Sequence, residues 1–198
     1  MNNAPDLNQI FEAAIFAAKK HQGQVRKDES RSPYVTHPIS VAQTLFELGG
    51  ITDTATLIAA LLHDIIEDTS TTRDQVRTTF GDDILSLVLE VTDNKSLEKM
   101  ERKRLQVLHA PHLSYRAKLI KLADKLTNCQ DILFSPPRDW PLERRQEYIQ
   151  WGADVVSQMR GTNPELEAAF DQVLADAQEQ LGFVIQPFTT INQRSWAP

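Results

Sequence analysis

Apolar side chains recur three and four positions apart along most of this 198-residue chain, the spacing that places them on one side of an α-helix. The pattern predicts helices over residues 7–21, 38–48, 53–67, 73–80, 82–91, 97–109, 114–133, 142–159 and 164–181. Glycine and proline residues separate these helices, and no segment alternates as a half-buried strand does. We therefore expect an all-α fold, a single bundle of about nine to ten helices.

No stretch between the predicted helices has the composition of a linker, so residues 7–181 are expected to form one domain. After Gly182 the helical period is lost, and we expect residues 182–198 to form an irregular C-terminal tail. The second predicted helix is expected to turn six apolar side chains to the core: Ile39, Val41, Ala42, Leu45, Phe46 and Leu48.

Composition narrows the classes of protein that the chain can belong to. Charged residues make up 24% and hydrophobic residues 41%, as in ordinary globular domains. The formal net charge of -6 disfavours a nucleic-acid partner, although it leaves room for a local basic pocket. Cys129 is the only cysteine, which excludes an internal disulfide, and the apolar runs are too short to span a membrane. We expect a cytoplasmic protein without a membrane partner.

The most unusual stretch is the acidic segment over residues 61–68, which reads Leu-Leu-His-Asp-Ile-Ile-Glu-Asp. On a continuous helix, His63, Asp64, Glu67 and Asp68 would lie along one side, because Glu67 is four positions from His63 and three from Asp64, and Asp68 is four from Asp64. Three neighbouring carboxylates repel one another, and buried charge is unfavourable unless it is paired. A divalent cation is the natural partner, since imidazole and carboxylate together suit borderline metals.

Two further residues are candidates to complete a metal site. His37 precedes Pro38, which fits the first turn of a helix, so we expect its imidazole at a helix start rather than on a buried face. Asp124 lies in an otherwise apolar and basic run and needs a counter-charge, which Lys121, Lys125 or a cation can supply. A single His-Asp pair is weak evidence, and the occurrence of these features together favours a metal.

Five ordered segments carry a resemblance to a known family. They read Arg-Lys-Asp at 26–28, Pro-Tyr-Val-Thr-His-Pro at 33–38, Ala-Leu-Leu-His-Asp-Ile-Ile-Glu-Asp-Thr at 60–69, Val-Thr-Asp at 91–93 and Lys-Leu-Ala-Asp-Lys-Leu-Thr-Asn at 121–128. The order of these segments resembles that in the HD metal-dependent phosphohydrolases. The residues within each segment resemble those of the (p)ppGpp hydrolase domain of the RelA/SpoT homologues. With segments 101–107 and 146–148, the chain is most similar to the small, hydrolase-only alarmone hydrolases of the metazoan SpoT-homologue type.

The resemblance implies a fold, a reaction and a set of site residues. The fold would be an HD-type helical bundle, and the reaction would be manganese-dependent removal of the 3′-diphosphate of (p)ppGpp, giving GDP or GTP and pyrophosphate. One Mn²⁺ ion would be bound by His37, His63, Asp64 and Asp124. Glu67 and Asp68 would be the catalytic acids that handle water and protons. Six residues would bind the nucleotide: Arg26, Lys27, Lys99, Asn128, Arg144 and Tyr148.

The sequence departs from the family pattern at three places and leaves several alternatives open. The loop at Arg31-Ser32-Pro33 lacks the glycine that is usual before Tyr34, Asn94 stands where an acidic residue is common, and the tail after Gly182 has no counterpart in the family. The same site could act on another phosphorylated nucleotide, such as pppApp or NADPH. The chain could also bind alarmone without cleaving it, although the intact Glu67-Asp68 pair argues against this. The division of work between Glu67 and Asp68, the oligomeric state and the role of the tail are left open.

Overall fold

The computed structural model describes residues 4–188, and this part of the chain is built from α-helices. In chain order the helices are α1 (Leu7–Lys20), α2 (Thr36–Glu47), α3 (Thr54–Leu61), α4 (Ile65–Asp68), α5 (Arg73–Phe80), α6 (Asp82–Val91), α7 (Lys99–His109), the 3₁₀ turn η1 (Ala110–His112), α8 (Tyr115–Phe134), α9 (Leu142–Ser157) and α10 (Pro164–Leu181). Within the described residues the only β-type pairing is an isolated bridge between Val25 and Pro33. The prediction of an all-α fold is confirmed.

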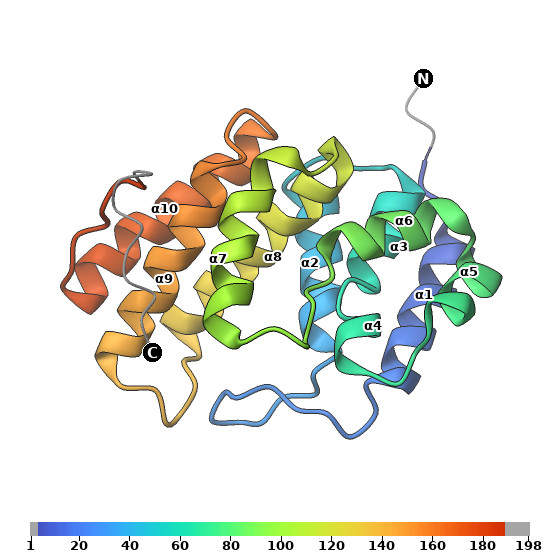
Figure 1. The fold of residues 1–198 in the computed structure, drawn as a ribbon, viewed down its shortest axis with the longest axis horizontal. Coiled ribbons are helices and arrows are strands. Elements are labelled where there is room, and N and C mark those ends of the chain that lie inside the picture. The colour runs from blue at the N-terminus through green and yellow to red at the C-terminus, as the bar shows by residue number, and fades with distance from the viewer. Residues whose placement is uncertain (1–3, 189–198) are drawn as a thin grey trace.

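Helix α8 is the centre of the bundle and contacts α2, α3, α6, α9 and α10. Figure 1 shows α1 and α3–α6 on one side of it and α9 and α10 on the other. Its apolar side chains, among them Ile120 and Leu122, are fully buried, each stabilising the fold by about 1.5–3 kcal/mol relative to exposure. Lys121, Asp124 and Lys125 are buried on the same helix. A charged residue this deep needs a partner, which makes α8 the helix on which a site is most readily built.

Local sequence signals set most helix ends. The Asp53 carboxylate accepts a hydrogen bond from the backbone N–H of Thr56, 3.0 Å away, and so caps α3. Gly182 ends α10 in the left-handed conformation, with φ 65°, where other residues are strained. Helices α5, α6 and α10 have the bounds that the apolar pattern predicted.

The prediction of one continuous helix over residues 53–67 is wrong. α3 ends at Leu61, His63 and Asp64 lie in a turn, and α4 starts at Ile65. The His63 ring takes part in this break, because its Nδ1 bonds the Ala60 carbonyl oxygen at 2.8 Å, a backbone group near the end of α3. Consecutive residues of a helix point apart, whereas the turn brings His63 Nε2 to 3.1 Å from Asp64 Oδ2.

Two expectations about α2 are also wrong. Val41, Ala42 and Leu45 are buried as expected, but the side chains of Ile39, Phe46 and Leu48 are 42%, 47% and 40% exposed. α2 packs on α3 and α8 through a single stripe, so its other apolar side chains face outward. His37 was expected away from a buried face, yet it is only 4% exposed. The helix starts at Thr36, and its first turn is already packed against the bundle.

Residues 183–188 form no helix, and they pack against the bundle. The Gln150 side chain of α9 holds Gln186 by two backbone hydrogen bonds of 2.8 and 3.0 Å. Phe183, Ile185 and Phe188 pack partly against the core. The rest of the predicted tail, residues 189–198, lies outside the described residues. In the described chain, no helix is both long and apolar enough to cross a membrane.

Candidate functional site: a metal cluster at the end of a basic pocket

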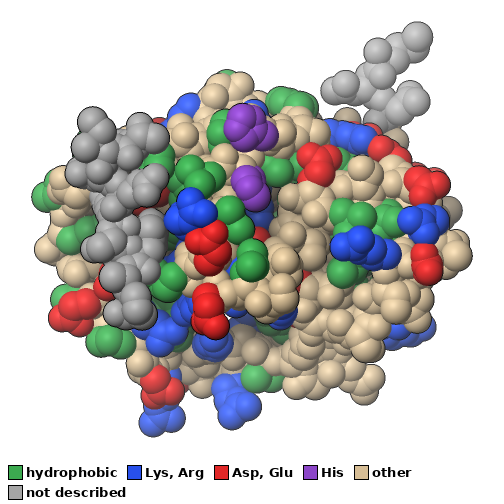
Figure 2. Space-filling view, in the orientation of Figure 1, with side chains coloured by type: hydrophobic (Ala, Val, Ile, Leu, Met, Phe, Trp, Pro, Cys, Tyr) green, Lys and Arg blue, Asp and Glu red, His purple; other side chains and the backbone are tan. Residues whose placement is uncertain are grey.

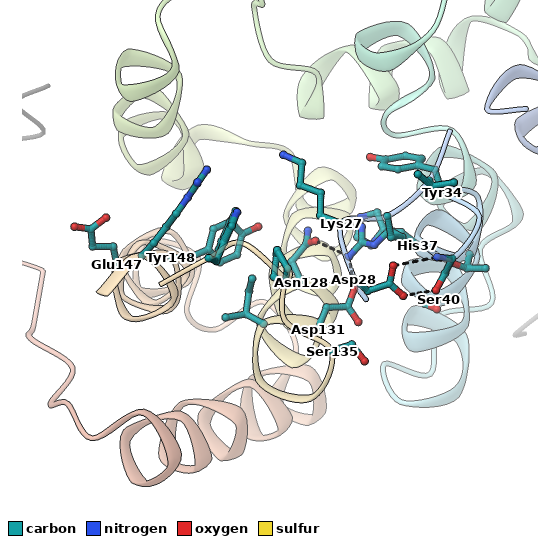
Figure 3. Close-up of a pocket in the computed structure, with 18 of the residues that line it drawn as sticks. Lys27, Asp28, Tyr34, His37, Ser40, Asn128, Asp131, Ser135, Glu147 and Tyr148 are labelled. Carbon is teal, nitrogen blue, oxygen red and sulfur yellow. Dashed lines mark hydrogen bonds and ion pairs between the residues drawn. The ribbon is translucent and has the colours of Figure 1, made fainter. Parts of the chain in front are cut away.

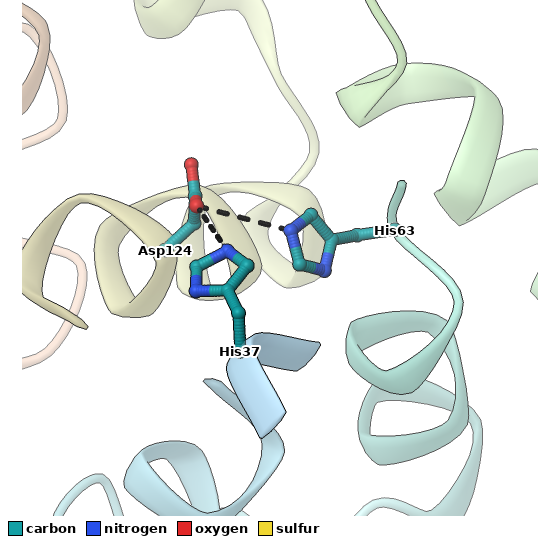
Figure 4. Close-up of side chains that lie close together, drawn as sticks. All are labelled: His37, His63 and Asp124. Atoms are coloured by element: carbon teal, nitrogen blue, oxygen red, sulfur yellow. Dashed lines mark ion pairs between the residues drawn. The ribbon is translucent and has the colours of Figure 1, made fainter. Parts of the chain in front are cut away.

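Three buried side chains from distant segments meet beside α8 (Figure 4). His37 comes from α2, His63 from the turn after α3, and Asp124 from α8. One possible ligand atom of each residue lies within 4.8 Å of those of the other two. Asp124 Oδ1 is 3.2 Å from His37 Nε2 and 3.8 Å from His63 Nε2. This cluster could hold a metal ion.

Hydrogen bonding fixes the tautomer of neutral His63 that leaves Nε2 free to bind a metal. Because a carbonyl oxygen can only accept, the 2.8 Å contact with Ala60 requires the proton on Nδ1 of His63. In the neutral imidazole, Nε2 then carries a lone pair, and this atom faces Asp64 and Asp124. Such a contact on the far ring nitrogen is the usual way in which a protein fixes a metal-binding histidine.

The electrostatics of the cluster also fit a cation. Burial disfavours a charged His63, but Asp64 and Asp124 outweigh it and raise the pKa of His63 to about 9. Burial likewise opposes ionised Asp124, yet Lys125 and the two histidines hold the pKa of that carboxyl well below its usual range. Burial lowers the pKa of His37. The metal-free cluster therefore takes up a proton at His63, in a place where a bound cation would satisfy the same carboxylates.

Asp64, the fourth predicted ligand, lies against this cluster rather than within it. Its Oδ2 is the oxygen that lies 3.1 Å from His63 Nε2, and it accepts a hydrogen bond from the Tyr34 hydroxyl. Tyr34 also donates to Asp68 Oδ2 at 3.1 Å. Burial, together with the Asp64 charge, raises the pKa of Tyr34, so this hydroxyl remains a donor. Tyr34 therefore joins a predicted metal ligand to a predicted catalytic acid.

The two predicted acids lie on α4, each with its own basic partner. Glu67 accepts the backbone N–H of Asp93 at 3.1 Å, and its Oε1 is 3.5 Å from Arg102. Burial raises the pKa of Glu67. Asp68 forms an ion pair with Lys95. Nothing in the sequence pointed to these basic partners, because Lys95 is 27 residues from Asp68 and Arg102 is 35 residues from Glu67.

A cavity of about 810 Å³ opens beside the cluster, and His37 is part of its wall. All six predicted nucleotide-binding residues line it: Arg26, Lys27, Lys99, Asn128, Arg144 and Tyr148. In Figure 3, Tyr148 of α9 and His37 of α2 lie on opposite sides, with Asn128 of α8 between them. The volume falls within the usual range of about 300–1,000 Å³ for small-molecule sites.

Two residues of the pocket wall, Asp131 and Lys103, were not among those predicted from the sequence. Arg26 is held by Asp131 and by Asn128 Oδ1 at 3.3 Å, and the Asn128 amide donates to Asp124 Oδ1 at 2.5 Å. Lys103 also lines the cavity. It lies one turn after Lys99 on α7, so its position on the same helix side was a signal that could have found it.

The comparisons with known proteins agree with this geometry. The chain matches the HD domain family over residues 13–173. It is 54% identical over 171 residues to guanosine-3′,5′-bis(diphosphate) 3′-pyrophosphohydrolase MESH1 of Xenopus tropicalis, covering 86% of this chain and 96% of that protein. It is 55% identical over 161 residues to the protein of the same name from Homo sapiens, covering 81% and 90%.

A solved structure is similar over nearly its whole length. It is described as a metazoan ortholog of SpoT that hydrolyses ppGpp and plays a role in starvation responses. The TM-score is 0.85 and the sequence identity 47%, with 90% of this chain and 99% of that chain covered. The bundle, the buried His-His-Asp cluster and these similarities lead to one conclusion. The chain belongs to the HD domain family and, within it, to the MESH1-type guanosine-3′,5′-bis(diphosphate) 3′-pyrophosphohydrolases.

Proposed function

We propose that this protein is a manganese-dependent enzyme that hydrolyses ppGpp and pppGpp to GDP or GTP and pyrophosphate. In this reaction water adds to the phosphorus next to the 3′ oxygen, the bond between them breaks, and the 3′ oxygen takes up a proton. The observation that carries the proposal is the meeting of His37, His63 and Asp124 beside a cavity that is lined by His37 and by all six residues expected to hold the nucleotide. The names of the relatives support the choice of substrate.

His37, His63 and Asp124 would hold the ion, with Asp64 as the fourth ligand. Carboxylate oxygens suit manganese, and the imidazoles make the donor set borderline enough for several divalent metals. A bound ion would polarise the phosphoryl oxygen and lower the pKa of a water molecule. The identity of the metal as Mn²⁺ rests on the resemblance to the family.

Glu67 and Asp68 would supply the proton chemistry. Burial raises the pKa of Glu67, which moves it toward the range in which a carboxyl group exchanges protons effectively at neutral pH. Asp68 is held between Lys95 and the Tyr34 hydroxyl, so its carboxylate has a fixed direction from which to orient water. We assign proton transfer to Glu67 and water orientation to Asp68.

The remaining pocket residues would hold the nucleotide. Arg26 lies 6.0 Å from the Tyr34 ring centroid and presents a planar guanidinium that can stack on a base. The Asn128 amide lies beside it, and Tyr148 forms part of the opposite wall. Lys27, Lys99 and Arg144 bring positive charge to phosphate groups. We propose that the protein does this work in the cytoplasm, as its sequence predicts.

The test is a substrate panel with purified protein and added Mn²⁺, comparing ppGpp, pppGpp, pppApp and NADPH. We expect pyrophosphate and GDP from ppGpp, no turnover after chelation, and none from His63→Ala. Faster turnover of pppApp or NADPH would change the substrate assignment while leaving the site in place. Tight binding of ppGpp by manganese-loaded protein with no product after long incubation would contradict an enzymatic function.

A further inference from the structure

Four basic side chains in the pocket wall are not held in a close ion pair, although the charge of Glu147 in the same wall favours the charged form of Lys103. Lys27, Lys99, Lys103 and Arg144 line the cavity, and in the described part of the chain none of them forms an ion pair. Arg26, which lines the same cavity, is paired with Asp131. The protein as a whole carries a net charge of -6, so carboxylates are not scarce. An anionic ligand is the remaining partner for this group.

The arrangement is unfavourable while the pocket is empty. Lys99 and Lys103 lie four positions apart on α7, and like charges at this spacing destabilise a helix. Burial and then the charge of Lys99 lower the pKa of Lys103 to about 8. Burial and then the charge of Arg144 lower the pKa of Lys99. A bound anion would remove this repulsion and return both side chains to full charge.

Lys103 occupies a distinctive place within the group. Its Nζ lies 4.7 Å from the ring centroid of Trp151 and 5.4 Å from that of Tyr148. The other lysine on Trp151 is Lys125, 4.2 Å from the ring and 3.0 Å from Asp124 of the metal cluster. Lys103 therefore contacts the same ring as the lysine that pairs with the metal cluster. Aromatic faces attract an ammonium group without neutralising it or using up its donors.

We infer that Lys103 is a specificity-determining residue that, together with Lys99 and Arg144, binds the phosphate group of the nucleotide that is not cleaved. The metal cluster can engage one phosphate group only, and the basic group beyond it would engage the other. The pocket would thus select nucleotides that carry phosphate on both sides of the ribose. The inference rests on the proposed function for the identity of the cleaved group. Figure 2 shows several Lys and Arg side chains, with Asp and Glu side chains beside them, in the lower left part of the face.

Steady-state kinetics on two substrates test the inference. The first is ppGpp, and the second is guanosine 3′-diphosphate with a free 5′ hydroxyl. We expect Lys103→Met to raise the KM for ppGpp by about tenfold to a hundredfold, the effect of losing a charge-assisted hydrogen bond. The KM for the 5′-hydroxyl substrate should change little, and Lys103→Arg should keep most of the discrimination. Lys19→Met, at an exposed lysine of α1, is the matched control.

Equal losses on both substrates, or an unchanged KM for ppGpp, would overturn the inference. Lys103→Gln is a second neutral variant, to be used if Lys103→Met does not fold. Thermal melting shows whether each variant is folded.

Calorimetric titration of the metal-free protein with GDP separates this inference from the proposed function, because it requires no turnover. We expect wild-type protein to bind GDP about tenfold more tightly than Lys103→Met. Weaker GDP binding by the variant, in a protein that fails to hydrolyse ppGpp, would support the phosphate site and reject the proposed reaction. Equal binding by both proteins would reject the site.

Discussion

The acidic cluster and the basic pocket that opens beside it, called here the inner and the outer end of the site, treat charge in opposite ways. At the inner end, Asp124 is held by Lys125, Glu67 by Arg102 and Asp68 by Lys95, so each acid has a basic partner within the fold. At the outer end, Lys27, Lys99, Lys103 and Arg144 form no ion pair in the described chain. One end is ordered by the protein itself, and the other is left for a ligand to neutralise.

This contrast predicts which kinetic constant each end controls. Groups that are fixed before the substrate arrives stabilise the transition state without rearrangement, so changes at the inner end should lower kcat or abolish metal binding. Groups whose charge is satisfied only by the substrate contribute to ground and transition states alike, so changes at the outer end should raise KM. An inner-end variant that changed only KM, or an outer-end variant that changed only kcat, would show that the two ends act as one unit.

The largest effect is expected from Asp124→Ala. This substitution removes the carboxylate that both histidines approach, and it leaves Lys125 buried without its partner. We expect loss of manganese binding, measured by paramagnetic resonance, and turnover at the background rate. The control is Asp171→Asn, which removes an exposed carboxylate paired with Arg160. A variant that retained one tightly bound ion would remove Asp124 from the ligand set.

Glu67→Gln should have the next largest effect. The amide keeps the size of the side chain and can still contact the Asp93 backbone, but it cannot transfer a proton. We expect kcat to fall by about 10²–10⁴-fold, the usual contribution of a general acid or base, with manganese binding unchanged. Measuring kcat, KM and bound metal on the same preparation distinguishes this from a ligand defect. An unchanged kcat would shift the proton transfer to Asp68.

Arg144→Met tests the outer end and should have a smaller effect. Arg144 lies 4.3 Å from the Trp140 ring centroid, and methionine preserves part of that apolar contact while removing the charge. We expect KM for ppGpp to rise by about tenfold with kcat nearly unchanged, and the dependence of KM on salt to become weaker. Initial rates at several salt concentrations measure both. A fall in kcat without a change in KM would contradict the division between the two ends.

The smallest effect is a pH dependence that should arise from Lys103. Its pKa is lowered to about 8, so the side chain is charged below that pH and becomes neutral as the pH rises through it. The charged groups around it are Lys99, Lys125, Arg144 and Glu147. Because the neutral form no longer attracts phosphate, KM for ppGpp should rise above about pH 8. Lys103→Arg should flatten this rise, since arginine stays charged. If wild-type protein and Lys103→Arg showed the same dependence of KM on pH, the rise in KM would come from another titrating group.

The sequence determined the local structure well. Apolar spacing and the glycine and proline stops gave most helices nearly their observed bounds, because these signals act within one or two turns of the chain. The resemblance of five short segments gave the family and six residues that all line one cavity. The number of ligands, the catalytic roles and the domain bounds stay predictions.

Tertiary packing decided what the sequence could not. It broke the predicted helix at Leu62, buried His37, and brought Lys95 and Arg102 to the two acids. It also placed Lys103 between Trp151 and Tyr148, facing the same cavity as Arg144. The reason is physical: helical spacing reports only which residues share a side of one helix. Which sides meet, and which charges are left without a partner, depends on how helices far apart in the chain pack around α8.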